Sequence, residues 1–137
     1  MKRKNTAGNK VARNVLTGIA VGAAVIVLGA MVEAYMIHTD MMSLNGVGYA
    51  SAFTVLVASF LAALIGGRGT TGKARLITVL AAGIGLCIVL FVCNIALFGA
   101  NLSGAGITML LILGCSLSVF LLLSKGHRKK FVKIPKL

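Results

Sequence analysis

The sequence predicts an all-α integral membrane protein, a single bundle of four transmembrane helices. Hydrophobic residues make up 58% of its 137 residues and charged residues only 12%, about half the charged share of ordinary soluble domains. The apolar residues form four runs, over residues 15–37, 49–66, 76–98 and 104–123. Each run is close to the roughly 20 residues that a helix needs to cross a bilayer. Little sequence is left for a soluble domain, so residues 1–137 are predicted to form one transmembrane domain with basic tails.

The first predicted helix, residues 15–37, follows a polar basic flank and contains a single charged residue, Glu33. A basic flank before an apolar stretch is also how a secretory signal peptide begins. The apolar stretch before Glu33 covers residues 15–32, which is longer than the roughly 7–15 residues of a signal-peptide core. We therefore expect this segment to remain in the protein as its first span.

The other three predicted helices are separated by turns at residues 38–48, 67–75 and 99–103. None of the four runs alternates polar and apolar residues, as the strands of a membrane barrel do. Each run is also about twice as long as a barrel strand. Because backbone hydrogen bonds in lipid must be made within the protein, the remaining structure for these runs is the helix.

The positions of the basic residues predict the orientation. All 14 Lys and Arg residues lie in the N-terminal flank, in the turn of residues 67–75 or in the C-terminal tail. Four spans place these three segments on the same side of the membrane, and the positive-inside rule assigns that side to the cytoplasm. We expect a multi-pass protein of the plasma membrane with both termini in the cytoplasm.

The C-terminal tail is predicted to contact the anionic lipid headgroups of the cytoplasmic leaflet, because clustered basic residues next to a span are attracted to them. A net charge of +12 would also suit a nucleic-acid-binding protein, but no aromatic platform or recognition helix accompanies the charge. Membrane lipids are therefore the expected partner, and no nucleic acid is expected. The basic residues of the tail are Lys125, Arg128, Lys129, Lys130, Lys133 and Lys136.

One face of the first helix carries small residues and Glu33. At about 100° per residue, Gly18, Gly22, Gly29 and Glu33 fall within a stripe roughly 60° wide. Gly18 and Gly22 form a GxxxG pair, which lets a second helix approach closely. Glu33 is the only acid in any predicted span, and an ionisable group in a membrane usually faces the bundle and often marks function. Because Glu33 lies about one turn from the outer end of its helix, roughly 6 Å, a structural or interfacial role near water is also open.

The third helix carries Asn94 at a matching depth. Counted from the inner ends of their runs, Glu33 and Asn94 lie equally far along, and Gly83 shares a face with Asn94. These positions predict a hydrogen bond between Glu33 and Asn94, as a functional or structural polar pair. Gly83 and Gly104 are predicted to be further helix-packing glycines.

No catalytic or cofactor site is predicted. The three cysteines, Cys87, Cys93 and Cys115, lie within apolar runs and are expected to be small apolar filling residues. Their spacing does not match a metal motif, and no nucleophile, base and orienting group can be assembled. We expect no cofactor, no metal and no enzymatic activity.

The whole chain resembles a family of small four-helix membrane proteins that is typical of Gram-positive bacteria and is known as a domain of unknown function. The resemblance depends on the basic N-terminus, the four spans and a basic, Gly-rich turn after the second span. That turn comprises residues 62–68 and continues to Gly72 and Lys73, and the third span that follows contains Gly83 and Gly85. The resemblance implies a bacterial plasma membrane, and it implies no reaction, ligand or catalytic residue.

Two functions remain open from the sequence. The first is a non-enzymatic interaction or accessory protein, whose protein partner is either a second copy of the chain or another membrane protein. The alternative is a small proton-coupled transporter that uses Glu33. Small four-helix multidrug transporters also carry a single Glu in their first span, but in this chain Glu33 lies nearer the outer end of its span, and Trp is absent.

Overall fold

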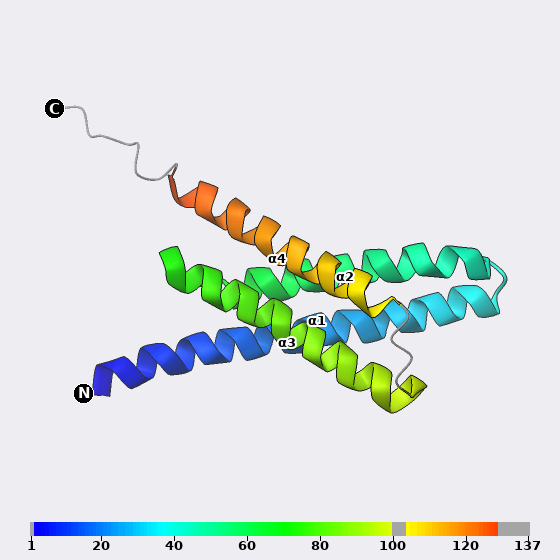
Figure 1. Ribbon diagram of the computed structural model, residues 1–137, viewed down its shortest axis with the longest axis horizontal. Coiled ribbons are helices and arrows are strands. Elements are labelled where there is room, and N and C mark those ends of the chain that lie inside the picture. The colour runs from blue at the N-terminus through cyan, green and yellow to red at the C-terminus, as the bar shows by residue number, and fades with distance from the viewer. Residues whose placement is uncertain (1, 100–103, 129–137) are drawn as a thin grey trace.

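The computed structural model describes residues 2–99 and 104–128, which form four α-helices and contain no strand (Figure 1). The helices are α1 (Lys2–His38), α2 (Leu44–Gly66), α3 (Gly72–Phe98) and α4 (Ala105–Arg128). Each is long and apolar enough to cross a membrane. The prediction of an all-α protein with four membrane-spanning helices is therefore confirmed.

The helices extend beyond the apolar runs from which they were predicted. The basic flank continues α1 back to Lys2, and α4 continues to Arg128, inside the basic tail. Lys and Arg have helix propensities close to those of Leu and Met, and no Pro interrupts either extension. The apolar runs therefore marked the part of each helix that suits lipid, and they did not mark where the hydrogen-bonded helix begins or ends.

Two helix ends depend on residues with a left-handed backbone. Asp40 has φ 55° and lies in the turn between α1 and α2. Gly99 has φ 61° and follows the end of α3, where its N–H donates to the carbonyl oxygen of Ile95. A left-handed residue after a helix is a common way to end it, and glycine adopts this conformation without steric cost.

Helices α1 and α2 form a long antiparallel hairpin, and α3 and α4 lie across it (Figure 1). The contact between α1 and α2 is the most extensive in the bundle. It is a contact of small residues: a Cβ atom at Gly18 would lie 2.5 Å from the Ala62 carbonyl oxygen, and one at Gly22 would lie 3.2 Å from the Ala58 carbonyl oxygen. Backbones come this close only where side chains are nearly absent, which is how membrane helices commonly associate.

The buried core is narrow and is composed of small and branched residues. Fully buried side chains include Ala58, Ala62, Val79, Leu86 and Ile112. Large apolar side chains are instead exposed on the outside of the bundle, among them Leu28, Tyr49, Phe53, Ile88 and Leu110. An apolar exterior around a core of small residues is what a protein surrounded by lipid needs, because lipid rather than the core covers its large side chains.

Candidate functional site

Glu33 is bound by two hydroxyl groups of the neighbouring helix. Ser51 Oγ donates to Glu33 Oε2 (2.7 Å), and Thr54 Oγ1 donates to Glu33 Oε1 (2.9 Å). Thr54 Oγ1 also lies 3.1 Å from the carbonyl oxygen of Ala50, but its single proton favours the shorter contact, which goes to a carboxylate. All three side chains are half-buried, so both oxygens of the acid are hydrogen-bonded within the α1–α2 hairpin.

The predicted hydrogen bond between Glu33 and Asn94 is wrong. The donors to Glu33 come from α2, and within residues 2–99 and 104–128 the buried Asn94 Oδ1 has no hydrogen-bond partner. The prediction compared only how far each residue lies along its own helix. It took no account of the crossing of α3 over the hairpin (Figure 1). The glycine stripe of α1 sets the actual partner: Gly29 contacts Thr54, and one helical turn further along α1, Glu33 meets Ser51.

The predicted packing glycines fall into two groups. Gly18, Gly22 and Gly29 face α2, and Gly83 contacts Ser116 of α4. Gly104 does not pack against a helix: it is exposed, it has φ 84°, and a Cβ atom there would meet nothing within 4 Å. It precedes the first turn of α4, where its left-handed backbone directs the chain into the helix, so its role is conformational.

At the opposite end of the bundle, Arg75 connects the α2–α3 turn to α4. Its Nε donates to the carbonyl oxygen of Thr70 (2.7 Å), and its Nη1 donates to the carbonyl oxygen of Leu123 (2.8 Å). The guanidinium thus binds a carbonyl of the last turns of α4, where cations are favoured by the helix dipole. Sequence analysis counted Arg75 only as an orienting charge, since its carbonyl partner on α4 lies 48 residues away in sequence.

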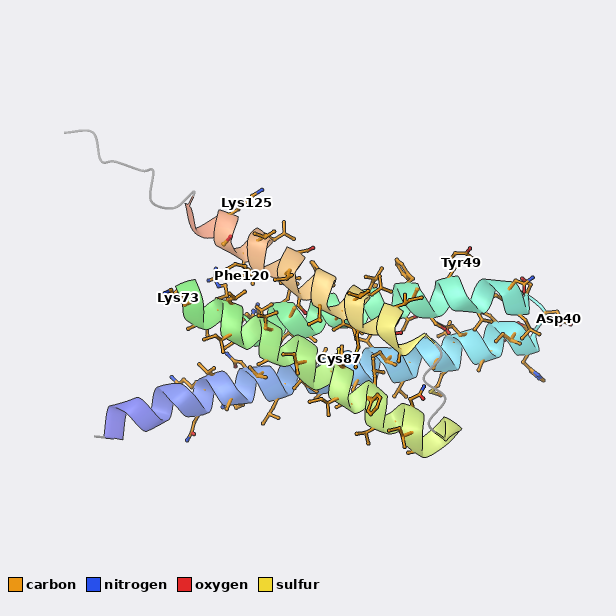
Figure 2. The ribbon with its side chains drawn as sticks, viewed as in Figure 1. Asp40, Tyr49, Lys73, Cys87, Phe120 and Lys125 are labelled. Carbon is orange, nitrogen blue, oxygen red and sulfur yellow. The ribbon has the colours of Figure 1, made fainter. Side chains whose placement is uncertain are left out.

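The basic residues that the structure describes lie at this same end of the molecule. Lys73 and Lys125 lie together at this end, and Asp40 lies at the other (Figure 2). Asn14 links α1 to the basic α2–α3 turn, because its Nδ2 donates to the carbonyl oxygen of Arg68 (3.0 Å). Among the predicted lipid-binding residues, Lys125 is exposed and Arg128 ends α4. The others lie outside the described residues: Lys129, Lys130, Lys133 and Lys136.

Asn94 lines a cavity of about 260 Å³ between α2, α3 and α4. Val55 contributes from α2, Cys87 from α3, and Thr108 and Ile112 from α4. Sequence analysis identified Asn94 as a polar residue of the third span, and it missed the cavity because a cavity depends on how far three helices separate. The described residues do not include a group of three His, Cys, Asp or Glu side chains that could hold a metal ion.

The fold and these sites define the class: a small multi-pass membrane protein with two polar sites inside its helical bundle. Comparisons with protein families, with curated proteins and with solved structures found no match to this chain.

Proposed function

We propose that this chain is a small non-enzymatic accessory protein of the bacterial plasma membrane, which acts by binding other membrane components. The observation that carries the proposal is the Glu33 site, where both carboxylate oxygens accept hydroxyl hydrogen bonds from α2. Such a carboxylate holds two adjacent helices together. A carboxylate that transports protons must instead change its partners in every cycle.

Both termini are proposed to face the cytoplasm, with anionic headgroups of the inner leaflet as the lipid partner. The support is the separation of charge along the bundle: Lys73 and Lys125 lie at one end and Asp40 at the other (Figure 2). The N-terminal end of α1, which carries Lys10 and Arg13, lies at the same end of the bundle as Lys73 (Figures 1 and 2). Basic loops remain on the cytoplasmic side during insertion, and they are attracted to its anionic lipids.

The alternative function is proton-coupled transport through Glu33. One observation favours it: Thr54, a hydrogen-bond partner of Glu33, also lines a shallow groove on the surface of the hairpin, together with Gly29 and Val32. An ionisable residue in a span that is reached from such a groove is a reasonable proton site. In this case the two hydroxyl groups would hold the carboxylate in position between proton transfers.

Substitution of Glu33 tests these two functions against each other. Glu33→Leu removes two interhelical hydrogen bonds, which in membranes average about 0.6 kcal/mol each, so we expect a loss of about 1 kcal/mol of stability. Glu33→Gln keeps one acceptor oxygen and should lose about half of that. The measurements are melting in detergent and proton flux in proteoliposomes under a pH gradient. We expect neither variant to change the flux.

The only other acid of the chain provides the matched control. Asp40→Asn removes a carboxylate at the exposed turn, and Asn also tolerates the left-handed backbone there. If the wild type and Asp40→Asn both move protons, and Glu33→Gln abolishes the flux while losing no more stability than the small loss expected above, the accessory function is wrong and the transporter takes its place.

A further inference from the structure

The cavity at Asn94 contains a polar atom that the bundle leaves without a partner. Asn94 Oδ1 is buried and accepts no hydrogen bond from any residue that the structure describes, although buried polar atoms are nearly always paired. Among the described residues that line the cavity, the only hydroxyl group is that of Thr108, and its Oγ1 donates to the carbonyl oxygen of Gly104 (3.1 Å) rather than to Asn94. An amide oxygen is an acceptor only, so the group that completes this site must be a hydrogen-bond donor.

The lining of the cavity determines the charge of its occupant. Around Asn94, the described residues that line it are apolar or uncharged, including Val55, Leu90, Phe91 and Ile112. An ion would lose its hydration there without gaining a counter-charge, which is strongly unfavourable. The occupant is therefore neutral, with one donor group near Asn94 and an apolar body against the aliphatic and aromatic side chains.

The volume of the cavity limits the size of the part of the ligand that it encloses. At about 30 Å³ for each water-sized group, the cavity of about 260 Å³ holds about nine non-hydrogen atoms. An apolar groove shares Cys87, Phe91 and Met109 with the cavity and continues along Ile84 and Ile88. A longer aliphatic chain can therefore extend from the cavity along the outside of α3.

We propose that this cavity binds a small neutral molecule with an aliphatic body and one hydrogen-bond donor, whose donor group binds Asn94 Oδ1. An aliphatic alcohol is the simplest compound of this kind. The ligand is either a small alcohol that enters from solution or the hydroxyl end of a lipid-sized alcohol from the membrane. The proposal goes beyond the accessory function and does not depend on it, because it concerns neither Glu33 nor the basic end of the bundle.

The native cysteines allow a test with a built-in control. Cys87 lines the cavity, whereas Cys93 lies exposed on the same helix, next to Asn94 in sequence. Two single-thiol proteins are reconstituted into liposomes: one keeps Cys87 and the other keeps Cys93, with Ser at the other two cysteine positions in each. The rate of alkylation by N-ethylmaleimide then reports access to the cavity in the first protein and access from the lipid face in the second.

The probes are two isomers of one formula, octan-1-ol and methyl heptyl ether, each titrated and compared by its mole fraction in the membrane. Both have nine non-hydrogen atoms, and only the alcohol has a donor. We expect octan-1-ol to half-protect Cys87 at about a fivefold lower concentration than the ether does, as one neutral hydrogen bond predicts. Cys93 should not distinguish the isomers. Hexadecan-1-ol distinguishes a small ligand from a lipid-sized one. Half-protection of Cys87 at the same mole fraction as octan-1-ol, or at a lower one, indicates a lipid-sized ligand, and weaker protection than by octan-1-ol indicates a small one.

Asn94→Leu provides the variant arm. Leu has a similar size and lacks the acceptor, so the variant should fold, and the two isomers should protect its Cys87 equally. Three results would overturn the proposal: no protection of Cys87 by any of the three compounds, equal potency of the two isomers in the protein that retains Asn94, or a preference for octan-1-ol that persists in Asn94→Leu. The first two results need no variant at position 94, so the test does not depend on the folding of Asn94→Leu.

Discussion

A single methyl group at Gly18 should weaken the bundle, and the same methyl group at Gly114 should not. A Cβ atom at Gly18 would lie 2.5 Å from the carbonyl oxygen of Ala62 and 3.1 Å from the backbone nitrogen of Gly66. Both contacts are with backbone atoms, so no change of side-chain rotamer relieves them. Gly114 lies in α4, is exposed, and has nothing within 4 Å of its would-be Cβ atom.

The expected magnitude follows from the separation that Gly18→Ala forces. Helix α1 must move away from α2 by about 0.5–1 Å, which forfeits a quarter to a half of the dispersion attraction at each contact that opens. Over-packing of this kind typically costs about 1–3 kcal/mol. Both variants replace Gly by Ala within a helix and gain a similar helix propensity, about 1 kcal/mol at most. Gly18→Ala should therefore be less stable than Gly114→Ala by about 1–3 kcal/mol.

Unfolding in mixed micelles with increasing sodium dodecyl sulfate, followed by circular dichroism, measures this difference. The two variants are compared with each other and with the wild type at the same lipid and detergent ratio. Equal stability of Gly18→Ala and Gly114→Ala would refute the close contact of α1 and α2. This holds whether both variants match the wild type or both lose stability to the same extent, because of the two glycines only Gly18 has backbone atoms next to its would-be Cβ atom.

Three further predictions concern the basic end of the bundle. Arg75→Met should lower stability by about 1–3 kcal/mol, because two backbone carbonyls lose a charged donor; a melting curve unchanged from the wild type would contradict the connection to α4. Single cysteines placed at positions 45 and 101 of a cysteine-free protein should react with an impermeant maleimide in intact cells, and those at positions 5, 70 and 130 should not; external labelling at 70 or 130 contradicts the orientation. A peptide of residues 124–137 should bind anionic vesicles, at about 1 kcal/mol for each basic residue near the surface, and should dissociate as salt rises; equal binding to neutral vesicles would exclude an electrostatic contact.

The sequence predicts those features that depend on one helix at a time. Length and composition of the apolar runs are enough to find four spanning helices, because lipid permits little else. Periodicity alone places Gly18, Gly22 and Gly29 on the face of α1 that carries Glu33, and in the structure this face meets α2. Helix ends were less predictable, since the backbone of α1 continues as helix far into the polar flank, to Lys2.

Features that depend on two or three helices together could not be predicted in this way. Glu33 and Asn94 have similar depths in their own helices, but α3 crosses the hairpin at an angle (Figure 1), so equal depth does not bring them together. The role of Arg75 depends on where α4 ends beside the α2–α3 turn. Gly104 resembled the packing glycines in spacing, and only its backbone φ of 84° shows that it serves the start of α4.

Glu33 and Asn94 differ in the hydrogen-bond donors that the bundle provides, and this difference makes Asn94 rather than Glu33 the stronger candidate for a functional site. An acid in a span attracts attention first because it is costly to bury, yet Glu33 has a donor for each carboxylate oxygen, which accounts for it structurally. Asn94 is neutral and looks ordinary in the sequence, but its oxygen is buried without a donor in a cavity that apolar side chains could fill. A bundle selected only for stability would gain from Leu at position 94, because an unpaired buried acceptor costs about 1–3 kcal/mol. Departures from the rule that buried polar atoms are paired occur mainly at functional sites. We therefore infer that Asn94, rather than Glu33, is the residue that binds a ligand.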